Sequence, residues 1–275
     1  MPFHVLVATS LTVPVEQPGR IAVSVAVAAA DPGSERLSVT DEAGTAVGVS
    51  EVATAGGRVH VVAVDPGEVT LDYAAAVTPH RPWAESAATS VTEEEQIVYL
   101  RPSRYCPSDR IAGLATSQFG GLSPANAVRA IEEWLNVEIR YQPGSTAADD
   151  DARHPLLMRE GVCRDFAHLG GAMCRALGIP ARYTSVYAPG LDPMDFHAVA
   201  EAAVDGRWRV FDGTRLAPRQ SLVRIASGRD AADTALVTPL EANVGMVTPT
   251  LTVTAQPDLP NDDRSSLVSL QQPPR

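Results

Sequence analysis

The chain has 275 residues, of which 45% are hydrophobic, and a formal net charge of −11 at pH 7. This length and apolar content are sufficient for one large or two modest domains. Residues 1–100 carry 4 arginines and 13 acidic residues, and this acidic excess argues against a nucleic acid or an anionic membrane as the partner.

Three cysteines, Cys106, Cys163 and Cys174, are too few for a disulfide framework. The first residues lack the basic segment and the continuous apolar segment of a signal peptide, and no stretch approaches the roughly 18 apolar residues of a membrane span. These features predict a reducing, cytoplasmic location in which the thiols stay free.

Residues 2–78 alternate between apolar and polar side chains, as half-buried strands do. Val69, Leu71 and Tyr73 are one example, and turn signals such as Asp65-Pro66-Gly67 separate the strands. We therefore expect an N-terminal antiparallel β-sandwich-like domain over residues 1–98. Its scattered histidines, His4, His60 and His80, are interpreted as structural.

A proline-rich, irregular connection is predicted over residues 79–107, with Glu93, Glu94 and Glu95 as a solvated run. Helices are expected from Ser108 onward, and Ser123-Pro124 is a typical helix start. Together with strands between residues 181 and 254, these helices predict an α+β core over residues 99–255. The polar, proline-rich residues 256–275 are expected to form a disordered tail.

The segment from Cys163 to Leu177 predicts a helix, because apolar residues recur at helical spacing and Gly178 and Pro180 follow as stop signals. Gly161 lies just before it, so Cys163 falls in the first turn. The positive end of the helix dipole and the unpaired N–H groups there favour a thiolate, which is the reactive form of cysteine. Cys163 is therefore a candidate nucleophile, whereas Cys174 is expected to be a core residue.

Asp205-Gly206 between two apolar segments predicts a β-hairpin with a two-residue turn. That turn places Val199 opposite residue 212 and makes Asp212 the diagonal neighbour of His197, about 7–8 Å away at the backbone. A carboxylate there could orient one imidazole nitrogen and leave the other to take a proton from a thiol. An edge histidine with an unrelated aspartate is the alternative, and the presence of Cys163 at a helix start favours the chemical interpretation over it.

Several segments resemble the motifs of bacterial transglutaminase-like proteins. The resemblance covers about residues 99–235, and its motifs are Gly161-Val162-Cys163-Arg164-Asp165-Phe166-Ala167-His168, Asp195-Phe196-His197-Ala198 and Trp208-Arg209-Val210-Phe211-Asp212-Gly213-Thr214. It implies a papain-like core in which a helix that starts with the cysteine packs on an antiparallel sheet that holds the histidine and the aspartate. Two positions depart from the family pattern: Val199 stands where an aromatic is common, and Gly213 where proline is usual.

The resemblance implies that Cys163 is the nucleophile, that His197 is the general base and acid, and that Asp212 orients His197. Asp165 and His168 match the same motif and are expected to support the triad, with a direct role as the alternative. They lie three apart on the helix, so they could pair with each other. The oxyanion is expected to bind the Cys163 backbone N–H and a second donor that the motifs do not identify. No metal and no organic cofactor is expected.

The expected activity is cysteine-dependent acyl transfer on a peptide or another amide, through a thioester. Transfer to water would make the protein a peptidase or amidase, and transfer to an amine would make it a transglutaminase; both stay open, as does the oligomeric state. The alternatives are a non-catalytic transglutaminase-like binding scaffold and an arylamine-type acetyltransferase. A Cys/His metal site is disfavoured, because no closely spaced Cys-x-x-Cys or His-x-x-x-His pair is present.

Overall fold

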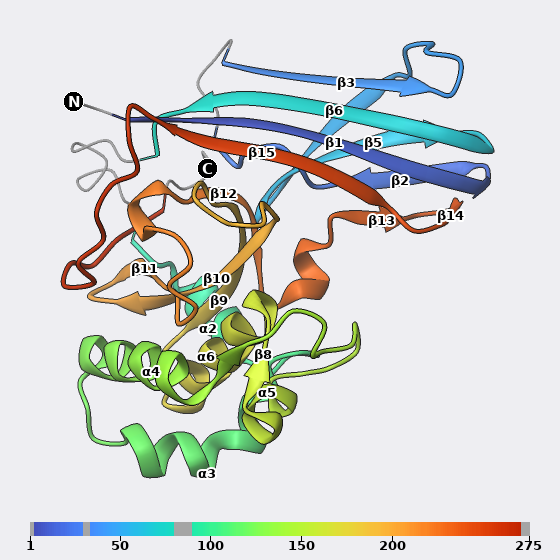
Figure 1. Cartoon of the computed structure of the whole chain (residues 1–275). Helices are drawn as coiled ribbons and strands as arrows, with labels where there is room; N and C mark the ends of the chain where they lie inside the picture. The colour runs from blue at the N-terminus through green and yellow to red at the C-terminus, as the bar shows by residue number, and fades with distance from the viewer. Residues whose placement is uncertain (1–2, 30–33, 80–89, 271–275) are drawn as a thin grey trace.

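The computed structural model describes residues 3–29, 34–79 and 90–270, and it combines helices with antiparallel sheets. Figure 1 shows the long strands at one end of the molecule and helices α3, α4, α5 and α6 gathered at the other. This arrangement confirms the predicted α+β class. His80 and residues 271–275 lie outside the described part of the chain.

The first sheet has five strands in the order β14-β1-β6-β3, and β15 also pairs with β1. Its strands are β1 (His4–Gln17), β3 (Glu35–Asp41), β6 (Gly67–Val77), β14 (Asn243–Val244) and β15 (Thr248–Gln256). The predicted alternation is present in β6, where Val69, Leu71 and Tyr73 are buried and the residues between them are not. One face of this sheet therefore packs and the other faces solvent.

The second sheet has eight strands in the order β11-β10-β9-β12-β5-β2-β13, and β4 pairs with β5. Its strands are β2 (Gly19–Val23), β4 (Val49–Thr54), β5 (Gly57–Val64), β9 (Ala181–Tyr187), β10 (His197–Val204), β11 (Arg207–Phe211), β12 (Val223–Gly228) and β13 (Val237–Pro239). Leu11 and Leu71 of the first sheet share one apolar core with Ile21, Val62 and Ile225 of the second. The two sheets are therefore packed face to face, as in a sandwich.

The helices cover the other end of the second sheet. They are α2 (Glu93–Leu100), α3 (Ser108–Phe119), α4 (Pro124–Glu138), α5 (Arg153–Met158) and α6 (Cys163–Ala176), with the 3₁₀ turns η1 (Arg219–Ser221) and η2 (Ala231–Thr234). A short parallel pair, β7 (Arg140–Tyr141) and β8 (Glu160–Gly161), precedes α6. Among the described residues, no helix combines the length and apolar character needed to span a membrane.

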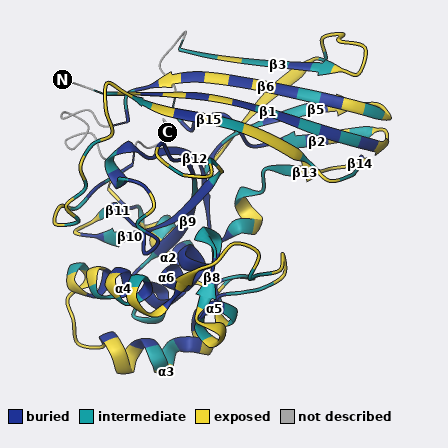
Figure 2. Cartoon of the chain, viewed as in Figure 1, coloured by how far each residue is buried: buried dark blue, intermediate teal, exposed yellow. Residues whose placement is uncertain are grey.

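Helix α6 is the centre of this part of the fold. All its residues from Asp165 to Arg175 are buried, and the helix contacts α3, α4, α5, β9 and β10 (Figure 2). Leu169 and Met173 pack with Leu135 of α4 and Phe211 of β11 in a second apolar core. The helix ends as predicted: Gly178 adopts a φ of 76°, and the Ile179 N–H donates to the Cys174 carbonyl at 2.9 Å.

The prediction of a disordered tail from residue 256 is wrong as far as residue 270. Val268 and Leu270 are buried, and the Val210 N–H donates to the Val268 carbonyl at 2.8 Å. Asp262 forms an ion pair with the buried Arg219, with 2.9 Å between its Oδ2 and the Arg219 Nε. A polar, proline-rich composition predicted disorder, but these contacts join residues far apart in the sequence and cannot be read from composition.

The connection between the predicted domains also differs from expectation. Thr92 and Glu95 form a capping box, in which the Glu95 N–H donates to the Thr92 Oγ1 at 3.1 Å and the Thr92 N–H donates to the Glu95 Oε2 at 2.9 Å. The glutamate run is thus the first turn of α2, and the predicted boundary at residue 98 falls inside this helix. Strands β14 and β15, predicted as part of the core, complete the first sheet instead.

Candidate active site

Cys163 is the first residue of α6 and is partly exposed. Asp165, two residues later, caps the start of this helix: its Oδ2 accepts a hydrogen bond from the Val162 N–H at 2.8 Å. Gly161 allows this approach, since a Cβ there would lie 2.9 Å from the Asp165 Cβ. The thiol therefore sits in a first helical turn, where unpaired N–H groups and the helix dipole favour negative charge.

The hairpin of β10 and β11 brings His197 and Asp212 together. Its register runs from Val204↔Arg207 to Ala200↔Phe211, as the Asp205-Gly206 turn predicted, and both turn residues have positive φ. His197 begins β10 and Asp212 follows β11, with 3.0 Å between the His197 Nε2 and the Asp212 Oδ2. The predicted hydrogen bond between these two side chains is confirmed.

The charges around His197 favour its protonated form. Burial lowers the pKa of His197, but the Asp212 carboxylate, its hydrogen bond and a hydrogen bond with the Cys163 side chain together raise it to about 10. Burial likewise opposes ionisation of Asp212, but the charge and hydrogen bond of His197 keep its pKa below the usual range. Because Asp212 holds Nε2, Nδ1 is the ring nitrogen left for the thiol.

Asp212 is itself held from several sides. Its Oδ1 accepts hydrogen bonds from the Thr214 N–H at 2.9 Å and the Thr214 hydroxyl at 2.7 Å. Its backbone N–H donates to the Glu132 Oε1 of α4 at 3.0 Å. Burial raises the pKa of Glu132 despite the nearby guanidinium groups of Arg219 and Arg264. The C-terminal segment that binds Arg219 thus supports this network through a buried cluster of charges.

Asp165 and His168 do not pair with each other, although their spacing would allow a local pair. The Oδ1 of Asp165 faces the Arg164 guanidinium, and the His168 Nε2 accepts a hydrogen bond from the Ala231 N–H at 3.1 Å. His168 is fully buried between Tyr105 and Tyr183, and burial lowers its pKa to about 3. It is therefore a neutral ring that anchors η2. The spacing suggested a local pair, but the two side chains bond to different elements.

The other two thiols lie away from solvent. Cys174 is in the core as predicted, and Cys106 packs in the same core with its Sγ 3.4 Å from the His168 carbonyl. Burial raises the pKa of both thiols to about 12.

Among the described residues, no group of three or more His, Cys, Asp and Glu side chains is arranged to hold a metal ion.

Comparison with known proteins places this geometry in a family. Residues 113–213 match the model of the transglutaminase-like superfamily. A crystal structure from Cytophaga hutchinsonii, named as a candidate cysteine protease, is 31% identical, superposes with a TM-score of 0.81 and covers 98% of both chains. The chain belongs to the transglutaminase-like superfamily. The match and the superposition support a cysteine-type enzyme family.

Mycobacterial relatives match shorter segments of the chain. An uncharacterized protein of Mycobacterium leprae is 30% identical over 162 residues, and one of Mycobacterium tuberculosis is 33% identical over 121 residues. The aligned segments span 56% and 38% of this chain, and only 58% and 38% of the respective relatives.

The two departures from the transglutaminase-like pattern have different surroundings. Val199 is buried in an apolar cluster with Val186 and Val210. Gly213 packs against α4 so closely that a Cβ there would lie 2.6 Å from the Leu135 Cβ. Glycine therefore fits the packing at this position, because the Cβ of any larger residue would clash with the Leu135 Cβ, which a change of rotamer cannot move.

A cavity of about 250 Å³ adjoins Cys163 and His197. Tyr183 of β9, Phe196 and Ser24 line it, and sequence reasoning identified none of them as site residues. Phe196 lies in the histidine motif, but no local signal marks Ser24.

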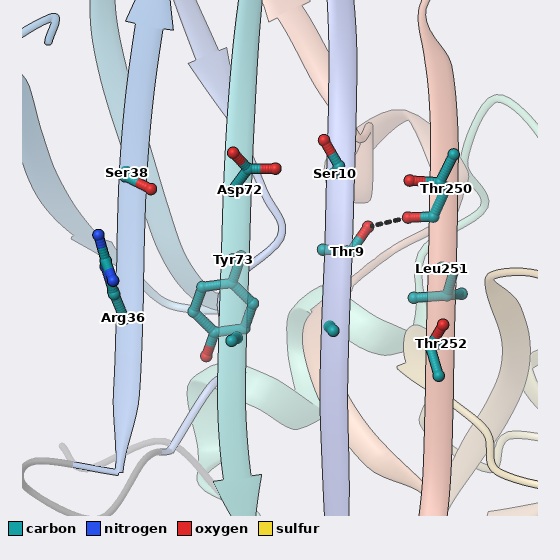
Figure 3. Close-up of a pocket in the computed structure, with 11 residues that line it drawn as sticks. Thr9, Ser10, Arg36, Ser38, Asp72, Tyr73, Thr250, Leu251 and Thr252 are labelled. Atoms are coloured by element: carbon teal, nitrogen blue, oxygen red, sulfur yellow. Dashed lines mark hydrogen bonds between the residues drawn. The ribbon is translucent and has the colours of Figure 1, made fainter.

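A larger hollow of about 510 Å³ lies on the polar face of the first sheet, where Arg36 and Asp72 are exposed (Figure 3), and the triad does not line it.

Tyr141 of β7 is a further residue at the site that the sequence reasoning did not identify. Burial is the main cause that raises its pKa to about 12, and the nearby Cys163 sulfur adds to the rise. The Cys163 backbone acts in the opposite direction and lowers this pKa. Tyr141 is therefore near Cys163, the residue whose N–H was predicted to bind an oxyanion.

Proposed function

We propose that the protein is a cysteine-dependent hydrolase of peptide or amide bonds that uses Cys163, His197 and Asp212. The observation that carries the proposal is the juxtaposition of a first-turn thiol with a buried His197–Asp212 pair. The full-length similarity to the Cytophaga hutchinsonii protein named as a candidate cysteine protease supports water as the acceptor. A cytoplasmic location stays a prediction.

In the proposed reaction, the Cys163 thiolate attacks the amide carbonyl carbon and forms a C–S bond. The His197 imidazolium gives its proton to the departing amine as the C–N bond breaks, which leaves a thioester. His197 then takes a proton from water, and the water oxygen attacks the thioester carbonyl. The C–S bond breaks, a carboxylic acid leaves, and the thiolate and imidazolium are restored.

Asp212 keeps the imidazole oriented throughout, as the aspartate of serine triads does. The Cys163 N–H is one donor for the oxyanion, and we assign the second to the hydroxyl of Tyr141, a residue near Cys163. Loss of one oxyanion donor lowers kcat by about 10²–10³ in a well-studied protease. Tyr141→Phe should then reduce kcat more strongly than it raises KM.

The test is trapping of the thioester. The protein is incubated with a panel of peptide amides, the intact mass is measured after an acid quench, and an acyl adduct is mapped to Cys163. Cys163→Ala should lose both the adduct and turnover, whereas Cys174→Ala, which removes a core thiol, should keep them. Ammonia or amine release, measured with and without an added primary amine, separates hydrolysis from transfer. Full turnover by Cys163→Ala would overturn the proposal, and absence of any adduct on a broad panel would favour a non-catalytic scaffold.

A further inference from the structure

The cavity beside Cys163 is built by both parts of the fold. Ser24, which directly follows β2, and Leu236, which precedes β13, come from the region of the second sheet that packs on the first. Cys163, Tyr183 and His197 come from α6, β9 and β10 respectively. Apart from Cys163 and His197, every residue that lines the cavity is uncharged. The cavity wall opposite the nucleophile therefore has no charged side chain that could pair with an ionised group of a ligand.

Ser24 contributes a polar group that the fold itself does not use. Its backbone N–H donates to the Leu236 carbonyl at 3.0 Å, which fixes this residue at the cavity wall. Its side-chain oxygen is buried and has no hydrogen-bond partner among the described residues, and the residue is only 6% exposed. Burying a hydroxyl without a partner is unfavourable, so this group is expected to bond to a water molecule or to a ligand that enters the cavity.

The size of the cavity limits what it can hold. At about 30 Å³ for each water-sized group, a volume of about 250 Å³ corresponds to roughly eight non-hydrogen atoms. That is below the usual range of about 300–1,000 Å³ for sites that bind drug-sized molecules. The cavity therefore suits a single amino-acid side chain.

We propose that this cavity binds the side chain of the residue whose carbonyl is attacked, and that it selects an uncharged side chain with an apolar stem and a polar end that bonds to Ser24. The inference rests on the proposed function, because it takes Cys163 as the nucleophile. Phe196, Ile225 and Leu236 would pack on the stem, and the Ser24 hydroxyl would donate to or accept from the polar end. An ionised side chain would lose its hydration, and the His197 imidazolium at the cavity is already paired with Asp212.

The experiment uses three peptidyl anilides that differ only at the residue before the scissile bond: glutamine, methionine and glutamate. These side chains have similar lengths but are polar, apolar and charged respectively. The wild-type kcat/KM should be about three- to tenfold higher for glutamine than for methionine, which is the usual value of one neutral hydrogen bond. The glutamate substrate should be at least about a hundredfold slower than glutamine because its charge is desolvated.

Ser24→Ala should make the glutamine and methionine substrates equal while leaving methionine nearly unchanged. Ser185→Ala is the matched control, because Ser185 also lines the cavity but its hydroxyl already donates to the Ala226 carbonyl at 3.3 Å. It should keep the glutamine preference. An unchanged glutamine-to-methionine ratio in a folded Ser24→Ala, or rapid cleavage of the glutamate substrate, would overturn the proposal. So would release of ammonia instead of the aniline, since the glutamine side chain would then be the reacting group.

Hydrolysis of p-nitrophenyl acetate separates this inference from the proposed function, because acetate has no side chain to bind. Turnover of this ester that depends on Cys163, together with an unchanged substrate ratio in Ser24→Ala, would reject only the cavity assignment. Ester turnover that does not depend on Cys163 would reject the proposed function and the cavity assignment with it. Melting temperatures of both serine variants establish that differences in rate do not arise from unfolding.

Discussion

Replacing Gly213 by alanine tests whether the position after Asp212 is fixed by packing against α4. A Cβ at this position would lie 2.6 Å from the Leu135 Cβ and 3.2 Å from the Phe166 Cδ1, whereas carbon atoms pack best at about 3.5–4.0 Å. The Leu135 Cβ is attached directly to the helix backbone, so a change of rotamer cannot relieve the closer contact. The backbone at residue 213 or helix α4 has to move.

Two effects of opposite sign set the size of the change in stability. Overpacking of a core costs about 1–3 kcal/mol, whereas exchanging glycine for alanine restricts the unfolded chain and stabilises by about 0.4–1 kcal/mol. The clash is the larger effect, so the free energy of unfolding should fall by about 1–2 kcal/mol. At about 2–4 °C per kcal/mol for a chain of this size, the melting temperature should fall by about 2–8 °C.

The same movement should affect the chemistry, because Asp212 is the neighbouring residue and orients His197 at 3.0 Å. A misplacement of about 1 Å can cost on the order of a hundredfold in rate, so kcat should fall about ten- to a hundredfold. Gly171→Ala is the control: a Cβ at this helical position meets nothing within 4 Å, and helix propensity favours alanine by about 1 kcal/mol. Urea unfolding and peptidyl-anilide turnover are measured for both variants. A Gly213→Ala protein as stable as the wild type would refute the steric reasoning.

Three further predictions concern charge and reactivity. Limiting iodoacetamide should label Cys163 first in tandem mass mapping, because burial raises the pKa of the other two thiols to about 12; preferential labelling of either would contradict the assignment. The folded-state pKa of His197 is raised from 6.5 to about 10, so its contribution to stability is full below pH 6.5 and is lost as pH rises to 10. His197→Gln should therefore lose less stability than the wild type between these pH values, and parallel unfolding curves would disprove the assigned pKa. Asp262→Ala should lower the free energy of unfolding, measured by urea titration, by about 3–5 kcal/mol, because the buried Arg219 guanidinium loses its bidentate partner. Asp263 is exposed, so Asp263→Ala should have a much smaller effect in the same titration.

The sequence alone determined the features that depend on neighbouring residues. The Asp205-Gly206 turn fixed the register of its hairpin, because a two-residue turn allows one pairing of the flanking strands. The stop signal at Gly178 ended α6 where expected, since glycine adopts positive φ without steric cost. The capping box of α2 was not predicted, although Thr92 and Glu95 stand at the required spacing.

Only the tertiary structure decided which distant groups meet at the site. Ser24 and Cys163 are separated by more than half of the chain, and only the packing of the two sheets brings them to one cavity. The partners of His168 and Asp212, Ala231 and Glu132, likewise come from other elements. Residues 257–270 are ordered by buried contacts and by the Asp262 ion pair. Such contacts depend on which surfaces the folded elements bury together, and that information is not contained in any local segment of the sequence.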